Sequence, residues 1–405
     1  MHLRNHYIKI FDHLIKYKSM IFLAGPRQSG KTTLAKLIAE KYSNSLYFNY
    51  DIVENKKKII ENPYFYESIN RKDGTKPLII LDEIHKFHNW KNYLKGVYDR
   101  DASHFHFLVL GSGRLNIYQK GGDSLAGRYL LFHLWPLTLC EYSKSQQTLD
   151  FFLQNINASY PHNNKYQEIW ENLFSLSGFP DPFFSKDKTY YRLWVKNYQN
   201  QLIREDIRDL SHVQKVDQMA LLLSLLPSKI GSPISIDNIA QDLSVSFDSV
   251  KKWLELFDTF FLTFNITPWS KKISRAIVSR KKIYLMDYAV IDSPGIQFEN
   301  MVALELFKSI NTWNDKGIGN FSLHYIRNKE KQEVDFLVAD NNKPLFIVET
   351  KLSDDHPSKS IHVFQNKLKI PAIQLINKPG ICKHYTNENN KISVMSASTW
   401  LSNLP

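Results

Sequence analysis

The sequence predicts an α/β protein in three parts: a parallel sheet covered by helices over residues 1–145, a mainly helical region over 146–290, and a mixed α/β region over 291–405. In the first part, short apolar runs alternate with helical patterns, which is typical of a parallel sheet covered on both faces. The strand pattern then gives way to long helical stretches and returns after residue 290. A chain of 405 residues is also too long for one ordinary core, so two or three domains are expected.

Five apolar runs are the candidate strands of the first part. They span Met20–Ala24, Ser45–Tyr50, Leu78–Leu81, Phe105–Leu110 and Tyr129–Leu134. A helix is expected over Lys31–Tyr42, because this segment places apolar side chains at helical spacing. We therefore expect five strands and their crossover connections in one domain.

A phosphate-binding loop is expected between the first strand and this helix, where the sequence fits G-x-x-x-x-G-K-[ST]. The nucleotide-binding candidates are Gly25, Pro26, Arg27, Gln28, Ser29, Gly30, Lys31, Thr32 and Thr33. The glycines let backbone N–H groups close around phosphates, Lys31 neutralises the β and γ oxygens, and the Thr32 hydroxyl is a magnesium ligand. The sequence therefore predicts a site for ATP and Mg²⁺.

Two carboxylates, Asp82 and Glu83, follow the third apolar run directly. We expect Asp82 to hold magnesium through water and Glu83 to polarise the attacking water as the catalytic base. The alternative is a strand that ends in solvated acids. Ser112 follows the fourth run, and it would sense the nucleotide if that strand lies between the first and the third.

A cation for the charge that develops during phosphoryl transfer is expected from Arg128, which precedes the fifth strand, in cis or from a neighbouring copy. Arg27, Arg114 and Arg204 compete for this catalytic role. Each of these arginines, taken alone, is also explained as a surface or ion-pairing residue.

A helix-turn-helix is predicted in the middle region. Ser235–Leu243 and Ser246–Phe257 have helical patterns and are joined by a short turn at Ser244–Ser246. Strand-like segments follow at Phe260–Ile266 and Lys282–Met286, as in a winged helix.

The helix over residues 246–257 would suit a DNA major groove. A basic run would suit phosphate contacts, and it comprises Lys271, Lys272, Arg275, Arg280, Lys281 and Lys282. The alternative is a winged helix that serves as a packing lid or a protein contact.

The last part predicts a helix over Gln297–Ile310 and strands at Leu323–Arg327, Glu333–Ala339 and Leu345–Glu349. If the turn between the last two strands centres on Asn342, residues whose numbers sum to 684 face each other.

This register places Asp335 opposite Glu349, with Cβ atoms about 5 Å apart, and alternation puts Glu349 and Lys351 on one face. Two carboxylates attract a hard divalent ion, so Asp335 and Glu349 are candidate metal ligands beside Lys351. Glu299, on the preceding helix, is the candidate third carboxylate. The alternative is a hairpin whose acids and lysines face water.

The charge balance favours a polyanionic partner, because 52 Lys and Arg against 40 Asp and Glu give a net charge of +12. A Lys-rich and Asn-rich composition also has a bland explanation in an AT-rich genome. Cys140 and Cys382 make neither a disulfide framework nor a zinc site, so a reducing compartment is expected. No signal peptide and no apolar run of ~20 residues is present, and the prediction is a cytoplasmic protein without a membrane partner.

The segments AGPRQSGKTTLA, LIILDEIHKFHNWKNYLKGVYD, LVLGSGRL, LAGRY and LWPLTLCEY resemble prokaryotic AAA+ superfamily ATPases of the archaeal-ATPase-like group. The resemblance runs end to end and implies an ATPase core, a helical and winged-helix region, and a C-terminal domain of uncharacterised function. It implies ATP hydrolysis with Lys31, Thr32, Asp82 and Glu83 in the roles given above and a sensor at Ser112. It permits rings, dimers or monomers, so a homo-oligomer is among the expectations.

Residues 295–375 resemble the PD-(D/E)XK nuclease fold, which is restriction-endonuclease-like. Glu299, Asp335, Glu349 and Lys351 match its pattern, with Val334-Asp335 in place of Pro-Asp. The resemblance implies a metal-dependent phosphodiesterase, or a domain that keeps the carboxylates and only binds.

Two functions therefore stay open. The first is an ATP-driven protein that processes DNA presented to the C-terminal site. The second is a nucleotide-switched regulatory or assembly protein whose C-terminal domain binds a partner protein and cuts nothing.

Overall fold

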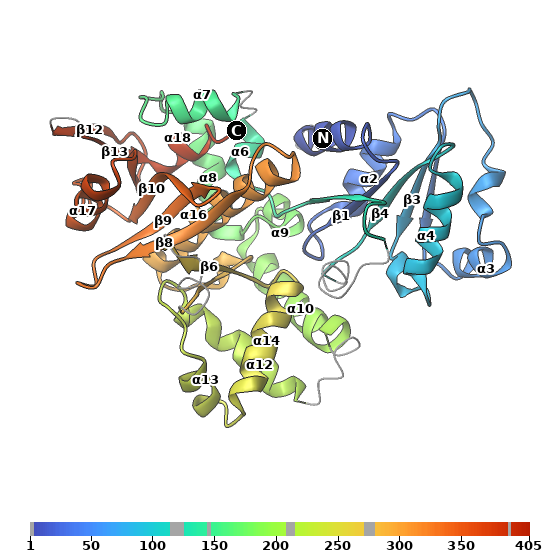
Figure 1. Cartoon of the computed structure of the whole chain (residues 1–405). Helices are drawn as coiled ribbons and strands as arrows, with labels where there is room; N and C mark the ends of the chain where they lie inside the picture. Colours follow the sequence, from blue (N-terminus) through green and yellow to red (C-terminus); the bar gives the residue numbers. More distant parts are fainter. Residues whose placement is uncertain (1–3, 114–124, 144–146, 208–214, 271–279, 388–389) are drawn as a thin grey trace. The chain divides into compact units, whose positions relative to one another are not determined.

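The computed structural model describes residues 4–113, 125–143, 147–207, 215–270, 280–387 and 390–405. The chain forms two compact units (Figure 1). The first unit comprises residues 1–135 with 259–261, and the second comprises 136–258 with 262–405.

The first unit contains a five-stranded parallel sheet in the order β2-β3-β4-β1-β5. Its elements are α1 (Asn5–Leu14), β1 (Met20–Ala24), α2 (Lys31–Ala39), β2 (Ser45–Asn49), α3 (Val53–Glu61), the 3-10 helix η1 (Phe65–Ser68), β3 (Leu78–Asp82), the 3-10 helix η2 (Ile84–Lys86), α4 (Trp90–Asp101), β4 (His106–Leu110) and β5 (Leu130–His133). All five predicted strands are confirmed, with ends that differ by no more than one residue.

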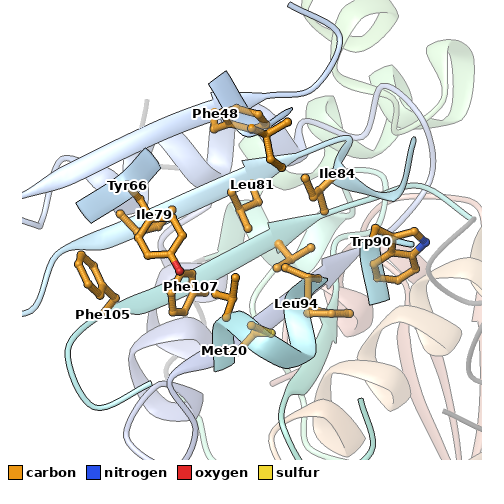
Figure 2. Packing of buried hydrophobic residues seen from close by; sticks show 14 of the residues in the cluster. Met20, Phe48, Tyr66, Ile79, Leu81, Ile84, Trp90, Leu94, Phe105 and Phe107 are labelled. Atoms are coloured by element: carbon orange, nitrogen blue, oxygen red, sulfur yellow. The ribbon is translucent and has the colours of Figure 1, made fainter. Parts of the chain in front are cut away.

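Two apolar cores lie on opposite faces of this sheet, because successive side chains of a strand point to opposite sides. Ile21 and Leu23 of β1 pack with α1 and α2. Met20 and Phe22 of the same strand pack with α3, η1 and α4. Figure 2 shows the second core, in which Trp90 and Leu94 of α4 lie in one cluster with Ile79, Leu81 and Phe107 of the strands. The continuous apolar runs in the sequence thus reflect strands buried on both faces.

The second unit combines a helical part with an eight-stranded mixed sheet. Its helices are α6 (Leu139–Ser143), α7 (Leu149–Gln154), α8 (Asn164–Leu176), α9 (Pro180–Ser185), α10 (Lys188–Gln201), the π-helical segment η4 (Leu202–Ile207), α12 (Val216–Leu225), η5 (Leu226–Lys229), α13 (Ile236–Asp242), α14 (Phe247–Thr259), η6 (Tyr288–Val290), α16 (Pro294–Asp315), α17 (Lys359–Leu368) and α18 (Ala397–Leu401). Its strands are β6 (Thr263–Pro268), β7 (Lys282–Leu285), β8 (Phe321–Arg327), β9 (Glu333–Asp340), β10 (Lys343–Lys351), β11 (Ala372–Ile376), β12 (Cys382–Asn387) and β13 (Asn390–Ser396). The predicted helical middle and mixed last part are confirmed.

The predicted helix-turn-helix forms from α13 and α14, with Ser244 of the turn in the left-handed backbone region at φ 53°. The apolar face of α14 is buried through Val250, Trp253, Leu254 and Phe257. The two strands after it, β6 and β7, form the antiparallel pair expected of a wing.

The eight strands run in the order β12-β13-β11-β10-β9-β8-β6-β7, so the wing strands continue the C-terminal sheet. The link is a short parallel pairing in which Thr267 and Pro268 lie opposite His324 and Tyr325. The predicted regions 146–290 and 291–405 therefore share one sheet, and a domain boundary between them stays a prediction.

The β9–β10 hairpin has the predicted register over most of its length. Phe346 pairs with Val338 and Val348 with Phe336, so the residue numbers sum to 684. The turn residues Asn341 and Asn342 both have positive φ, as a two-residue hairpin turn requires. A bulge between Pro344 and Phe346 restores the predicted register after this turn.

A second bulge lies between β8 and β9. His324 pairs with Leu337 and Ile326 with Val334, so Tyr325 faces both Asp335 and Phe336. Val334 and Leu337 consequently share one apolar core although they are three residues apart. Bulges re-aim side chains, and this one sets the direction of Asp335.

No helix in the described ranges is long and apolar enough to cross a membrane.

Leu108 is the side chain through which the stability of the first sheet is best tested, because it is fully buried in the central strand β4. We expect Leu108→Ala to lower the free energy of unfolding by about 2–5 kcal/mol, since it leaves a cavity in a close-packed core. The urea midpoint of unfolding measures the change. Ile60→Ala is the control, because Ile60 is 68% exposed, and an equal loss in both variants would contradict the assigned core.

Candidate functional site

The predicted phosphate loop connects the end of β1 to the start of α2. Its backbone enters the left-handed region at Gln28 (φ 59°) and Gly30 (φ 93°). Gly25 has φ 153°, and a Cβ there would lie 2.1 Å from the carbonyl oxygen of Leu134. Only glycine fits at position 25, which fixes the start of the loop against the end of β5.

The functional groups of the loop are held close to its backbone. The Lys31 ammonium donates to the carbonyl oxygens of Gly25 (3.0 Å) and Pro26 (2.7 Å), so it lies over the loop. The Ser29 hydroxyl is buried and has no hydrogen-bond partner among the described residues. Thr33 is exposed and Arg27 is half-buried. A loop with left-handed turns, an overlying ammonium and an unsatisfied hydroxyl fits a bound phosphate chain.

The predicted magnesium ligands meet although Thr32 is in α2, which follows β1, and Asp82 ends β3, which is not next to β1. The Thr32 hydroxyl donates to Asp82 Oδ2 at 2.9 Å. Tyr47 of β2 donates its hydroxyl to the same oxygen at 2.7 Å. The Asp82 carboxylate therefore has two neutral hydroxyl groups as hydrogen-bond donors, and its negative charge is available to a cation.

Burial raises the pKa of Asp82, and the nearby Glu83 carboxylate adds to this effect. The hydrogen bonds from Tyr47 and Thr32 and the charge of Lys31 act in the opposite direction. A carboxylate in this environment is stabilised by a bound cation, because the cation favours its ionised form. Thr32 and Asp82 thus fit Mg²⁺, which prefers oxygen ligands and retains bound water.

Glu83, the predicted base, lies at the end of β3 in the left-handed backbone region at φ 55°. Its carboxylate is within 3.1 Å of Lys86 Nζ and 3.4 Å of His85 Nε2. Lys86 also pairs with Asp51 at 2.6 Å. Glu83, next to Asp82, is therefore paired with the Lys86 side chain. The role of Glu83 as the general base stays a prediction.

Ser112 follows β4, and β4 lies between β3 and β1. The position of β4 between β3 and β1, which the prediction of a nucleotide sensor at Ser112 required, is therefore present. Gly113 has no room for a side chain, because a Cβ would lie 2.4 Å from the carbonyl oxygen of Thr259. Arg114 lies outside the described residues.

Arg128 does not fit the predicted role in cis. It precedes β5 and forms two hydrogen bonds to Asp99 of α4, at 2.7 and 3.0 Å. The amino end of β5 pairs with Ile21 at the amino end of β1, whereas the phosphate loop follows the carboxyl end of β1. Arg128 therefore lies at the amino ends of the strands and the loop at their carboxyl ends. Only a role of Arg128 in a neighbouring copy remains as a prediction. Arg204, a competing arginine, pairs with Asp217 at 3.0 Å in the second unit.

Two residues of the nucleotide site were missed in the sequence. Tyr47 is one, and its contact with Asp82 depends on the pairing of β2 with β3. Arg4 is the other: its buried guanidinium donates to the carbonyl oxygens of Ser29 (2.9 Å) and Trp135 (3.2 Å). No local motif marks Arg4, because its partners are 25 and 131 positions away.

The three predicted acids of the C-terminal site, Glu299, Asp335 and Glu349, are described together with Glu333, which was not predicted, and the four are here called the carboxylate cluster. Asp335 Oδ2 accepts hydrogen bonds from the Thr350 amide (2.8 Å) and hydroxyl (2.7 Å). This contact places Asp335 beside Thr350, the residue after Glu349.

Glu349 lies beside Lys351 as predicted, with Lys351 Nζ 2.8 Å from Glu349 Oε1. Its other oxygen accepts from the Ser358 hydroxyl at 2.5 Å. Burial raises the pKa of Glu349, and the Asp335 charge adds to the shift.

Glu299 enters the cluster from α16. It accepts hydrogen bonds from Tyr284 (2.7 Å) and Lys282 (3.3 Å). Burial and, after it, the Asp335 charge raise the pKa of Glu299 to about 7, although Lys282 and Tyr284 act in the opposite direction.

The cluster does not fit the divalent ion implied by the nuclease resemblance. Among the described residues, the three acidic or histidine groups that converge closely enough for an ion are Asp354, Asp355 and His356. They are largely exposed, and none was predicted as a ligand. Glu299, Asp335 and Glu349 do not converge in this way, and Glu299 and Glu349 are each paired with a lysine.

The predicted basic run is corrected at Lys282. This side chain is 1% exposed and pairs with Glu299 and Glu333, so it does not contact phosphates. Arg280 and Lys281 are exposed. Lys271, Lys272 and Arg275 lie outside the described residues.

The exposed face of α14 carries both signs of charge. Lys251 and Lys252 are exposed, and so are Asp248 and Glu255. This helix is therefore less basic than the net charge of the whole chain suggests.

Comparison with protein families gives three matches. Residues 17–143 match the family described as "AAA domain". Residues 167–293 and 294–400 match two families described as domains of unknown function, DUF8612 and DUF4143. The AAA match contains Lys31, Thr32 and Asp82, and it indicates a nucleotide-binding domain.

Similar proteins are found in Methanocaldococcus jannaschii and Mycobacterium tuberculosis. The chain is 24% identical over 388 residues to the uncharacterised protein MJ1544 of Methanocaldococcus jannaschii, covering 91% of this chain and 82% of the relative. It is 21% identical over 365 residues to the uncharacterised protein Rv2008c of Mycobacterium tuberculosis, covering 88% and 76%.

Solved structures with some likeness include the Walker-type ATPase PABY2304 of Pyrococcus abyssi, with a TM-score of 0.45, 12% identity, and coverage of 71% of this chain and 94% of that chain. Drosophila ORC bound to DNA gives a TM-score of 0.28 at 14% identity, covering 70% and 92%.

The hydrogen bond from Tyr47 to Asp82 yields a prediction for magnesium. We expect Tyr47→Phe to weaken Mg²⁺-dependent nucleotide binding by about 10–100-fold, because loss of a group that orients a metal ligand costs that much. Nucleotide affinity in EDTA should stay unchanged. The control is Tyr42→Phe, since the Tyr42 hydroxyl contacts His106 at the amino end of β4. Identical magnesium titrations of Tyr47→Phe and wild type would show that Tyr47 does not orient Asp82.

Proposed function

We propose that this chain is a magnesium-dependent ATPase that hydrolyses ATP in its first unit. The observation that carries the proposal is the 2.9 Å hydrogen bond between the Thr32 hydroxyl and Asp82, next to a loop covered by the Lys31 ammonium. These groups come from the two motifs expected to grip a triphosphate and its metal. The AAA-domain match over the same residues supports the proposal.

Each residue has a defined task in this proposal. The loop amides and Lys31 bind the phosphates and offset their charge. Thr32 and Asp82 hold Mg²⁺, which neutralises charge on the phosphate oxygens. Tyr47 and Arg4 orient Asp82 and the loop through the hydrogen bonds described above.

Glu83 is the proposed general base for the attacking water. Its side chain neighbours Asp82 and is 27% exposed, so water reaches it. Lys86 Nζ lies 3.1 Å from Glu83 Oε2, and this contact must loosen for Glu83 to accept a proton. Ser112 is proposed as the group that senses the γ-phosphate.

Substitutions at Lys31 and Glu83 separate binding from hydrolysis. Lys31→Ala should abolish detectable nucleotide binding. Glu83→Gln should retain binding and lower the hydrolysis rate by about 10²–10⁴-fold, because a general base contributes that much. Nucleotide affinity and phosphate release measure the two effects, with Glu61→Gln, an exposed acid on α3, as the matched control. Normal turnover in Glu83→Gln would refute its role as base.

Action on DNA is the second candidate function, and the observation that favours it is the folded helix-turn-helix with Lys251 and Lys252 exposed on α14. The net charge of +12 is consistent with a polyanionic partner. The mixed charge of α14 favours the other alternative, in which the second unit binds a partner protein under control of the nucleotide.

DNA binding distinguishes these alternatives. If α14 binds DNA, Lys251→Glu with Lys252→Glu should weaken affinity at least ~10-fold and reduce its salt dependence, because each phosphate contact releases counterions. The control pair is Lys329→Glu with Lys343→Glu, at two exposed lysines outside α14. Fluorescence anisotropy with duplex DNA at several salt concentrations measures both effects. Equal losses in the two double variants, or ATPase activity that no nucleic acid changes, would favour the protein-binding alternative.

A further inference from the structure

Lys282 is a deeply buried charged side chain that contacts two acids of the carboxylate cluster. It is the first residue of β7, and its side chain is 1% exposed. Its ammonium lies 2.7 Å from Glu333 Oε1 and 3.3 Å from Glu299 Oε1. The same ammonium is 5.4 Å from the centre of the Tyr325 ring, within cation–π distance.

The elements that supply these contacts are distant in the chain. Lys282 comes from β7, Glu299 from α16, Glu333 from β9 and Tyr325 from β8. Asp335 also interacts electrostatically with Lys282. An ammonium in this position carries out the charge compensation that a metal ion would provide between carboxylates, because buried acids of like charge require a cation.

Asp335 and Glu349 have hydrogen-bond and ion-pair partners of their own. Asp335 Oδ2 accepts two hydrogen bonds from Thr350. Glu349 has Lys351 on one oxygen and Ser358 on the other. A divalent ion that bound both Glu299 and Glu349 would therefore have to displace the Lys282 and Lys351 ammonium groups to obtain ligands at about 2.0–2.6 Å.

We propose that the Lys282 ammonium is the resident cation of the carboxylate cluster, in place of a divalent metal. The cluster is an ion-pair centre that fastens β7, and with it the wing after the helix-turn-helix, to α16 and β9. Phosphodiester cleavage by this centre does not occur, because the metal that such cleavage requires has no place there. This inference concerns the second unit and is independent of the proposed ATPase.

Metal binding tests the inference without any change at Lys282. The full chain carrying Asp82→Asn, free of nucleotide, removes the magnesium ligand of the first unit. Mn²⁺ titrated into this protein and followed by electron paramagnetic resonance should show no site tighter than ~1 mM, and adding Asp335→Asn should change nothing. A Mn²⁺ site that Asp335→Asn abolishes would overturn the inference. So would Mg²⁺- or Mn²⁺-dependent nicking of DNA that is lost in Asp335→Asn.

Substitution of Lys282 gives the complementary test in the same background. Lys282→Met keeps the length of the side chain and removes its charge, so the melting temperature should fall by roughly 6 °C or more, because the buried acids lose their cation. Millimolar Mn²⁺ should restore part of the loss, and Asp335→Asn should remove this rescue. Lys281→Met is the matched control, since Lys281 is exposed. An unchanged melting temperature in Lys282→Met would contradict the inference, and if this variant fails to fold, the Mn²⁺ titration above still decides.

Discussion

The edge formed by the carboxyl ends of β1, β3 and β4 is the constraint on which the nucleotide site depends. Parallel strands end at the same edge of a sheet, so residues after each strand meet there. Asp82 follows β3 and Thr32 follows the loop after β1, and β4 lies between these strands. The hydrogen bond between Thr32 and Asp82 forms only in this strand order. Ser112 follows β4 at this same end of the sheet. Arg128 precedes β5 and lies at the amino ends of the strands.

The sequence was sufficient to predict residues of the nucleotide site where they form a contiguous motif. The phosphate loop and the acids after β3 are local motifs, and their positions at strand ends follow from the apolar runs that precede them. Tyr47 and Arg4 could not be found in this way, because their partners are 35 and 25 or more positions away. Arg128 was assigned to the phosphate because a sequence does not reveal at which edge of a sheet an arginine lies.

The C-terminal hairpin shows a similar limit. Its register follows from the two-residue turn at Asn341 and Asn342 together with the bulge between Pro344 and Phe346, and the sequence revealed only the turn. The bulge opposite Tyr325 and the arrival of Lys282 from β7 are set by tertiary packing. The basic run that contains Lys282 was assigned to phosphate for this reason, although the fold buries this lysine against acids.

The two acidic centres of the chain differ in the chemistry of their partners. Asp82 is hydrogen-bonded by the neutral hydroxyls of Thr32 and Tyr47, which orient the carboxylate and leave its charge uncompensated. Glu299 and Glu333 are bonded by one ammonium, which orients both carboxylates and offsets part of their charge. A metal ion binds most favourably to a carboxylate that has no cation paired with it. A carboxylate that is already paired with a cation gains little interaction energy from a second cation. The identity of the donor therefore distinguishes Asp82, bonded by hydroxyl groups, from Glu299 and Glu333, bonded by an ammonium.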